Sequence, residues 1–221
     1  TSRRQFPLIA LKTVPAACAN VAEVCFDILP ASYVRRHAPI SRGLGRILMR
    51  LSGWQFDGTL PDVPKVVIVV APHTTNWDFA IGVMVLWALD IKISFLGKHT
   101  LFRGLFGRWM RSIGGIPVNR ASTHGMVGDA VEAFRTSARM VLALAPEGTR
   151  RLDKGFKMGF LHIAHGAGVP VLLAYFDFSR KVVGFGPLMH TSGDVSADLA
   201  TVLNYYRPIR GKYRKDWQRE C

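Results

Sequence analysis

A histidine and an aspartate stand close together in the sequence, between two long apolar segments. His73 comes just after the run 66–71, which is continuously apolar and rich in β-branched residues. Asp78 comes directly before a second apolar run, 79–89. A carboxylate beside an imidazole orients the ring and stabilises its protonated form, which leaves the second ring nitrogen to act as a general base. His73 and Asp78 are therefore candidate catalytic residues, with the histidine as the base.

The same stretch also has a purely structural interpretation. Thr75 and Asp78 fit a capping box, in which the aspartate replaces the usual glutamate and the threonine is the N-cap. A carboxylate in the first turn also suits the helix dipole. Capping leaves His73 unexplained, because this residue stands where a strand leaves a sheet, the edge at which open α/β sheets bind ligands. The spacing alone leaves both interpretations open.

Two further loops carry residue types that suit an anionic ligand, and each loop follows an apolar run. The residues are Arg120, Glu147, Gly148, Thr149, Arg150 and, shortly afterwards, Lys157. An arginine can bind a phosphate through two parallel hydrogen bonds, and a glycine permits close approach of the backbone. The glutamate can orient an arginine or accept a hydrogen bond from a substrate hydroxyl. The alternative is a pair of ordinary turns with surface charges.

The elements that position these residues are expected to alternate between strand and helix. The predicted strands are 66–71, 93–96, 116–118, 140–145, 171–176 and 182–185. The predicted helices are 76–89, 123–137, 160–167 and 194–206. Continuously apolar strands separated by helices predict an α/β fold, with a central, largely parallel sheet that is flanked by helices.

An amphipathic helix is expected over residues 41–52, before the first of these strands. One of its faces carries leucine and isoleucine, and another carries three arginines. The apolar face is Leu44, Ile47, Leu48 and Leu51, and the arginines are Arg42, Arg46 and Arg50. Trp54 and Phe56 follow directly. This pattern suits a helix lying in a membrane interface, and it also suits a surface helix that covers the core.

The chain is therefore divided into two parts. Residues 1–57 are predicted to be an N-terminal helical segment that associates with the membrane, with two short helices within 8–34. Residues 58–221 are predicted to be the α/β domain. The basic stretch 207–220, at the end of this domain, is either a solvated tail or a further membrane contact.

The charge of the chain favours an anionic partner. Its 221 residues include 29 basic and 15 acidic ones, which gives a net charge of +14. An anionic membrane surface, a phosphorylated substrate and a nucleic acid all suit this excess, as does a merely basic soluble surface. Because no nucleic-acid-binding motif is recognisable, a nucleic-acid partner is not expected.

Cysteine usage and hydropathy bear on the location. The three cysteines cannot all pair with one another and lack the spacing of a metal site, which favours a reducing compartment and predicts no metal. No apolar run reaches the roughly 18 residues of a membrane-spanning helix. We therefore expect a protein bound to the cytoplasmic face of the membrane.

Four blocks of the sequence can be compared with a known family. They are His73-Thr74-Thr75-Asn76-Trp77-Asp78, Gly115-Ile116-Pro117-Val118-Asn119-Arg120, Glu147-Gly148-Thr149-Arg150 and Val169-Pro170-Val171. In this order they resemble the motifs of the glycerolipid acyltransferase family, which includes the 1-acylglycerol-3-phosphate acyltransferases. Lys157 also stands at the distance from the third block that is familiar in this family. The resemblance extends over residues 42–190.

The resemblance implies an O-acyltransferase without cofactor or metal. Its substrates would be an acyl-thioester, on coenzyme A or acyl carrier protein, and a lysophospholipid such as lysophosphatidic acid. His73 would be the general base, oriented by Asp78. Arg120 and Arg150 would hold the anionic head of the acceptor. The other residues implied in the acceptor site are Glu147, Gly148, Thr149 and Lys157.

Two alternatives to this function remain open. Pro72 stands where many members of the family have asparagine, which leaves another lysolipid, such as a lyso-ornithine lipid, as the acceptor. The second alternative is a non-catalytic basic domain that binds membranes.

Overall fold

The computed structural model describes residues 26, 28–118, 125–148 and 155–214. Its strands are β1 (Gln55–Asp57), β2 (Lys65–Val70), β3 (Ser94–Lys98), β4 (Gly115–Val118), β5 (Met140–Leu144), β6 (Val171–Asp177) and β7 (Val182–Met189). Its helices are α1 (Pro39–Ser52), α2 (Trp77–Leu89), α3 (Gly104–Ser112), α4 (Gly125–Thr136), α5 (Gly159–Ala167) and α6 (Val195–Tyr206), with a short 3₁₀ helix η2 (His99–Phe102).

The strands of the described residues form one seven-stranded sheet in the order β1-β7-β6-β2-β5-β3-β4. Neighbouring strands from β6 to β4 are parallel, as the alternating pattern predicted. Strand β7 is antiparallel to β6, and β1 is parallel to β7. The reversal follows from the short connection between β6 and β7, because a parallel neighbour requires a crossover of a dozen or more residues.

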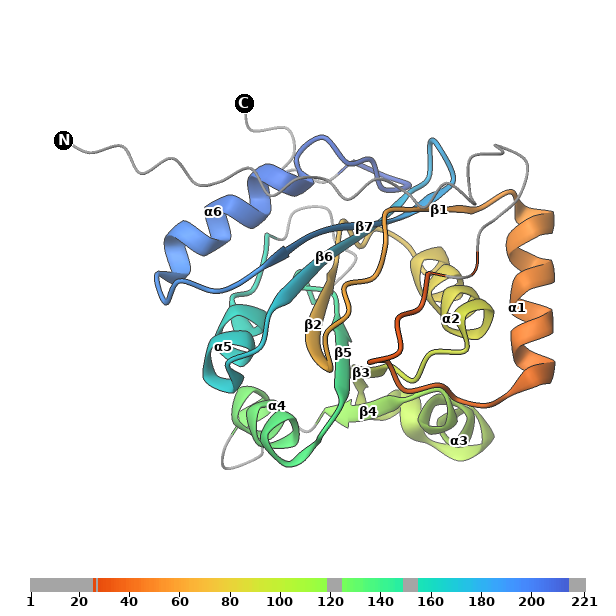
Figure 1. The fold of residues 1–221 in the computed structure, drawn as a ribbon, viewed down its shortest axis with the longest axis horizontal. Helices are drawn as coiled ribbons and strands as arrows, with labels where there is room; N and C mark the ends of the chain where they lie inside the picture. Colours follow the sequence, from red (N-terminus) through yellow and green to blue (C-terminus); the bar gives the residue numbers. More distant parts are fainter. Residues whose placement is uncertain (1–25, 27, 119–124, 149–154, 215–221) are drawn as a thin grey trace.

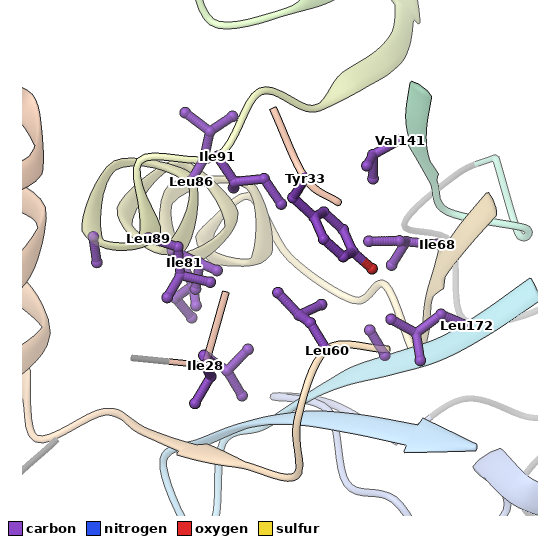
Figure 2. Close-up of a cluster of buried hydrophobic side chains, with 14 of the residues drawn as sticks. Ile28, Tyr33, Leu60, Ile68, Ile81, Leu86, Leu89, Ile91, Val141 and Leu172 are labelled. Carbon is purple, nitrogen blue, oxygen red and sulfur yellow. The ribbon is translucent and has the colours of Figure 1, made fainter. Parts of the chain in front are cut away.

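Helices cover both faces of this sheet (Figure 1). Helices α1 and α2 lie on one side, and α4, α5 and α6 lie on the other. Strand β2 contributes to both cores, because Val66 and Ile68 face the first side while Val67 and Val69 face the second. Figure 2 shows Ile68 of this strand in the first core. Burial on both faces explains why β2 is apolar at every position after Lys65.

The predicted amphipathic helix is confirmed as α1, and its faces are now defined. Gly45 and Met49 are buried, and Arg46 donates from Nε to the carbonyl oxygen of Ala88 in α2 at 3.3 Å. The outward apolar side chains are exposed to solvent, at 80% for Leu51 and 87% for Ile40. The predicted leucine and isoleucine face therefore does not cover the core of the domain.

The segment that follows α1 differs from the expected interfacial end of a helix. Trp54 is buried, with 6% exposure, and Phe56 lies in strand β1 and stacks on Phe185 of β7. These two aromatic residues therefore belong to the core and the sheet. The division of the chain at residue 57 stays a prediction. Strand β1, at the end of the predicted N-terminal segment, pairs with β7 of the sheet.

Two other expectations concern the N-terminal part and helix α3. Two short helices were expected within 8–34. Residues 8–25 and 27 of this range lie outside the described residues, and residues 28–34 contain a turn and no helix. Helix α3 is absent from the sequence prediction, because Gly104 and Gly107 lower its helix propensity. Within the described residues, no helix has the length and hydropathy needed to cross a membrane.

Candidate active site

The parallel arrangement of β2 and β5 brings two of the predicted loops together. These strands are direct neighbours, with Val69 opposite Leu144. The loop with His73 follows β2, and the loop with Glu147 follows β5, so both lie beyond the carboxyl ends of the strands. This is the edge at which open α/β sheets bind ligands.

His73 and Asp78 are in direct contact. Nδ1 of His73 lies 3.0 Å from Oδ2 of Asp78, and the carboxylate is almost completely buried while the imidazole is partly exposed. With Nδ1–H donating to the carboxylate, the lone pair of the ring lies on Nε2. A buried carboxylate orients the ring and stabilises its protonated form, which are the two requirements for a histidine base.

The same carboxylate also organises the start of α2. Oδ2 of Asp78 accepts hydrogen bonds from the backbone N–H of Thr74 at 2.7 Å and of Thr75 at 2.8 Å. The hydroxyl of Thr75 accepts from the N–H of Trp77 at 3.1 Å. The carboxylate therefore bonds to the N–H of Thr75 as the capping box predicted, but the N-cap of α2 is Asn76 and not Thr75. These hydrogen bonds hold Asp78 in the position from which it contacts His73.

Glu147 contacts the His73 loop from the neighbouring strand. It is completely buried, and both of its carboxylate oxygens lie 3.2 Å from the backbone nitrogen of His73, which donates to them. The sequence predicted Glu147 as part of the acceptor site, oriented towards an arginine or a substrate hydroxyl. The observed hydrogen bonds tie the third motif to the first, and the role of Glu147 toward the acceptor stays a prediction.

Lys157 lies over the same loop. Its backbone N–H donates to the carbonyl oxygen of Pro146 at 2.8 Å. Gly148 has a φ of +63°, and Nζ of Lys157 lies 3.3 Å from the position that a Cβ on Gly148 would occupy. The absence of a side chain at Gly148 therefore leaves room for the ammonium group. Arg120, Thr149 and Arg150 lie outside the described residues, but β4 and β5, which precede them, run parallel to β2.

Tyr206 supports this edge of the sheet and was missed by the sequence prediction. Its hydroxyl donates to the carbonyl oxygens of Val69 in β2 at 2.6 Å and of Ala174 in β6 at 3.0 Å. Burial raises the pKa of Tyr206 well above its ordinary value, so the phenol keeps its proton. An aromatic residue in the last turn of a helix gives no sequence signal for such a bridge.

The segment after α6 was also missed. The sequence predicted a solvated tail or a membrane contact over 207–220, of which 215–220 lie outside the described residues. Residues 211–213 instead lie against the His73 loop. The backbone N–H of Tyr213 donates to Oγ1 of Thr74 at 3.4 Å. A Cβ on Gly211 would lie 2.9 Å from Cγ2 of Thr74 and 3.0 Å from Cγ of Pro72.

The described residues contain no cluster of three His, Cys, Asp or Glu side chains suited to a metal ion. The absence of a metal and a cofactor from the reaction stays a prediction. The chemistry that the described site offers is a base at His73, and positive charge from Lys157.

Comparisons with known proteins give the family of the chain. The fold is similar to the crystal structure of the 1-acyl-sn-glycerophosphate acyltransferase PlsC from Thermotoga maritima, with a TM-score of 0.52 and 16% sequence identity. The similarity covers 79% of this chain and 81% of that chain. A search of curated proteins finds no match. The model of the acyltransferase family matches residues 59–175 of the 221, which include His73, Asp78 and Glu147, and this protein therefore belongs to the acyltransferase family.

Proposed function

We propose that this acyltransferase moves a fatty acyl group from an acyl-thioester, on coenzyme A or acyl carrier protein, to the hydroxyl of a lysophospholipid such as lysophosphatidic acid. The observation that carries the proposal is the contact between His73 and Asp78, because it leaves Nε2 of a carboxylate-oriented imidazole at the ligand-binding edge of the sheet. The membership in the acyltransferase family supports the same reaction type.

The reaction follows from this arrangement. Nε2 of His73 takes the proton of the acceptor hydroxyl as its oxygen attacks the carbonyl carbon of the thioester. Asp78 stabilises the imidazolium that forms. The C–S bond then breaks, and the leaving thiolate takes up the proton from His73. The products are the acylated lipid and a free thiol, and the histidine returns to its neutral form.

The acceptor's head group is proposed to lie against the loop after β5. Lys157 provides an ammonium group there, next to Gly148. Arg120, Thr149 and Arg150 are proposed to complete this anion-binding site. Their roles rest on the resemblance of their motifs to those of the family. Positive charge and bidentate guanidinium groups suit a phosphate, which supports a lysophosphatidate acceptor.

The exposed face of α1 is proposed to bind an anionic membrane surface on the cytoplasmic side. Its apolar side chains do not cover the core and are free to enter the acyl boundary. They are Ile40, Leu44, Ile47, Leu48 and Leu51. Arg42 and Arg50 on the same helix suit lipid phosphates, since basic side chains strengthen interfacial binding.

The test is a transfer assay with purified protein. Lysophosphatidic acid and other lysolipids, including a lyso-ornithine lipid, are offered with an acyl-coenzyme A and with an acyl carrier protein. We expect transfer to at least one lysolipid and its loss in His73→Ala. Transfer that persists at the wild-type rate in His73→Ala would contradict the proposed mechanism, and lack of transfer to every acceptor would favour a membrane-binding role without catalysis.

A further inference from the structure

A hollow of about 370 Å³ is lined in part by the residues that stand between His73 and Asp78 in the sequence. Its lining comes from two segments far apart in the sequence. One wall is residues 74–77 of the first motif, and the other is Lys212 and Tyr213. The second wall lies beyond residues 59–175, which the family model matches. This hollow is therefore completed by a segment that lies outside the residues matched by the family model.

The C-terminal wall is attached on both sides of Lys212. Ile209 is buried in the second core, and the carbonyl oxygen of Arg210 accepts a hydrogen bond from the N–H of Phe178 at 3.2 Å. Gly211 packs against Thr74, and the N–H of Tyr213 donates to the hydroxyl of the same threonine. The backbone around Lys212 therefore has a defined position relative to the first motif.

Lys212 places a positive charge at this hollow. Its Nζ lies 5.5 Å from the centre of the Trp77 ring, a cation–π contact with the opposite wall. Within the described residues, no carboxylate forms an ion pair with Lys212. An ammonium group held over an aromatic ring, without a carboxylate partner, is suited to bind an anion from a ligand in the hollow.

We propose that Lys212 binds a phosphate group of a substrate, and that residues 209–213 form part of the substrate site. The identity of the anion rests on the proposed function, in which the acyl donor and a lysophosphatidate acceptor both carry phosphate. Lys212 lies at the hollow, over Trp77, and we expect it to act on substrate binding and not on the proton transfer. Its effect is therefore expected in the Michaelis constant or dissociation constant for one of the two substrates.

The experiment uses the full chain and two soluble probes, coenzyme A and a short-chain lysophosphatidic acid. Trp77 lines the hollow and is 61% exposed, so its fluorescence reports occupancy, and Trp77→Phe identifies its share of the signal. We expect Lys212→Gln to weaken the binding of one probe by about threefold to tenfold, and Lys212→Arg to retain it. Weaker binding of coenzyme A assigns the phosphate to the donor, and weaker binding of the lysophosphatidate assigns it to the acceptor.

The matched control is Lys92→Gln, which removes the same charge at an exposed site. Lys92 follows the far end of α2, about 20 Å from Trp77 by the rise of the helix. The proposal is overturned if Lys212→Gln binds both probes as Lys92→Gln does, or if the wild-type protein binds neither probe. If the wild-type protein binds a probe through Lys212 but transfers no acyl group, the proposed function fails while the phosphate site stands.

Discussion

The backbone N–H of His73 points at the carboxylate of Glu147, with both oxygens 3.2 Å from the nitrogen. The two residues belong to different motifs, on the neighbouring strands β2 and β5. A buried carboxylate that holds the backbone of the proposed base limits the movement of the imidazole. Glu147 is therefore a positioning residue for His73 in addition to any role towards the acceptor.

Glu147→Gln tests this positioning role. The amide keeps the size of the side chain but loses its charge and one acceptor oxygen. We expect kcat to fall by about 10²-fold, the cost of a small displacement of a reacting group, while the Michaelis constant for the acceptor changes little. Steady-state kinetics over a range of acceptor concentrations separate the two constants. A raised Michaelis constant with an unchanged kcat would instead assign Glu147 to acceptor binding.

Asp78→Asn separates catalysis from helix capping. The amide oxygen still accepts hydrogen bonds from Thr74 and Thr75, but a neutral group does not stabilise an imidazolium. We expect kcat to fall by about 10³- to 10⁴-fold, with a loss of stability of about 1 kcal/mol, typical of a weakened cap. The control is Asp198→Asn in α6, which also removes a buried carboxylate that accepts from a backbone N–H. If both variants lose activity equally, Asp78 has no role beyond the fold.

The exposed face of α1 is tested by Ile47→Glu with Leu51→Glu. Both side chains are exposed, so the fold tolerates the change, and each glutamate adds negative charge where the proposal places lipid. We expect binding to anionic vesicles to weaken by at least about tenfold, since a buried leucine or isoleucine contributes about 1.5–3 kcal/mol. Co-sedimentation with vesicles measures the effect. Met126→Glu alters an exposed residue of α4, on the opposite side of the sheet, and should bind as the wild type does.

Substitution of Gly211 tests the contact between the C-terminal segment and the His73 loop. A Cβ at this position meets Thr74 and Pro72 at 2.9 and 3.0 Å, so one of the two segments must move. We expect kcat to fall in Gly211→Ala and to fall further, by about tenfold or more, in Gly211→Val. Gly43→Ala is the control, because no atom lies within 4 Å of the added Cβ. Wild-type kcat in both Gly211 variants would show that this contact does not position the loop.

Most strands and helices were predictable because their side-chain patterns reflect burial. Strand β2 is apolar after Lys65 because helices cover both faces of the sheet. Helix α6 follows an N-cap at Asp194, the first residue of the predicted helix. Helix α3 and strand β1 were not predictable in this way. The first contains two glycines, and the second is only three residues long, too short for a periodic pattern.

The exposed face of α1 shows a limit of such patterns. Periodicity identified the faces of the helix, but two kinds of partner, the core and a membrane, suit an apolar face equally well. The structure shows that the apolar face does not pack on the core, since Gly45 and Met49 are the buried residues and Leu51 points outwards. The contact with lipid stays a proposal that the vesicle experiment tests.

The sequence by itself indicated the acyltransferase family, through the resemblance carried by its motifs and their order, and it predicted His73 and Asp78 as the candidate pair. It also determined that His73 and Asp78 stand at the start of a helix after a buried strand. The tertiary structure alone decided what Glu147, Tyr206 and residues 209–213 contact. A carboxylate, a phenol or a glycine has many possible partners, and only the pairing of β2 with β5 and β6 selects among them. The chain between these segments is long, and such distant contacts leave no periodic trace in a sequence.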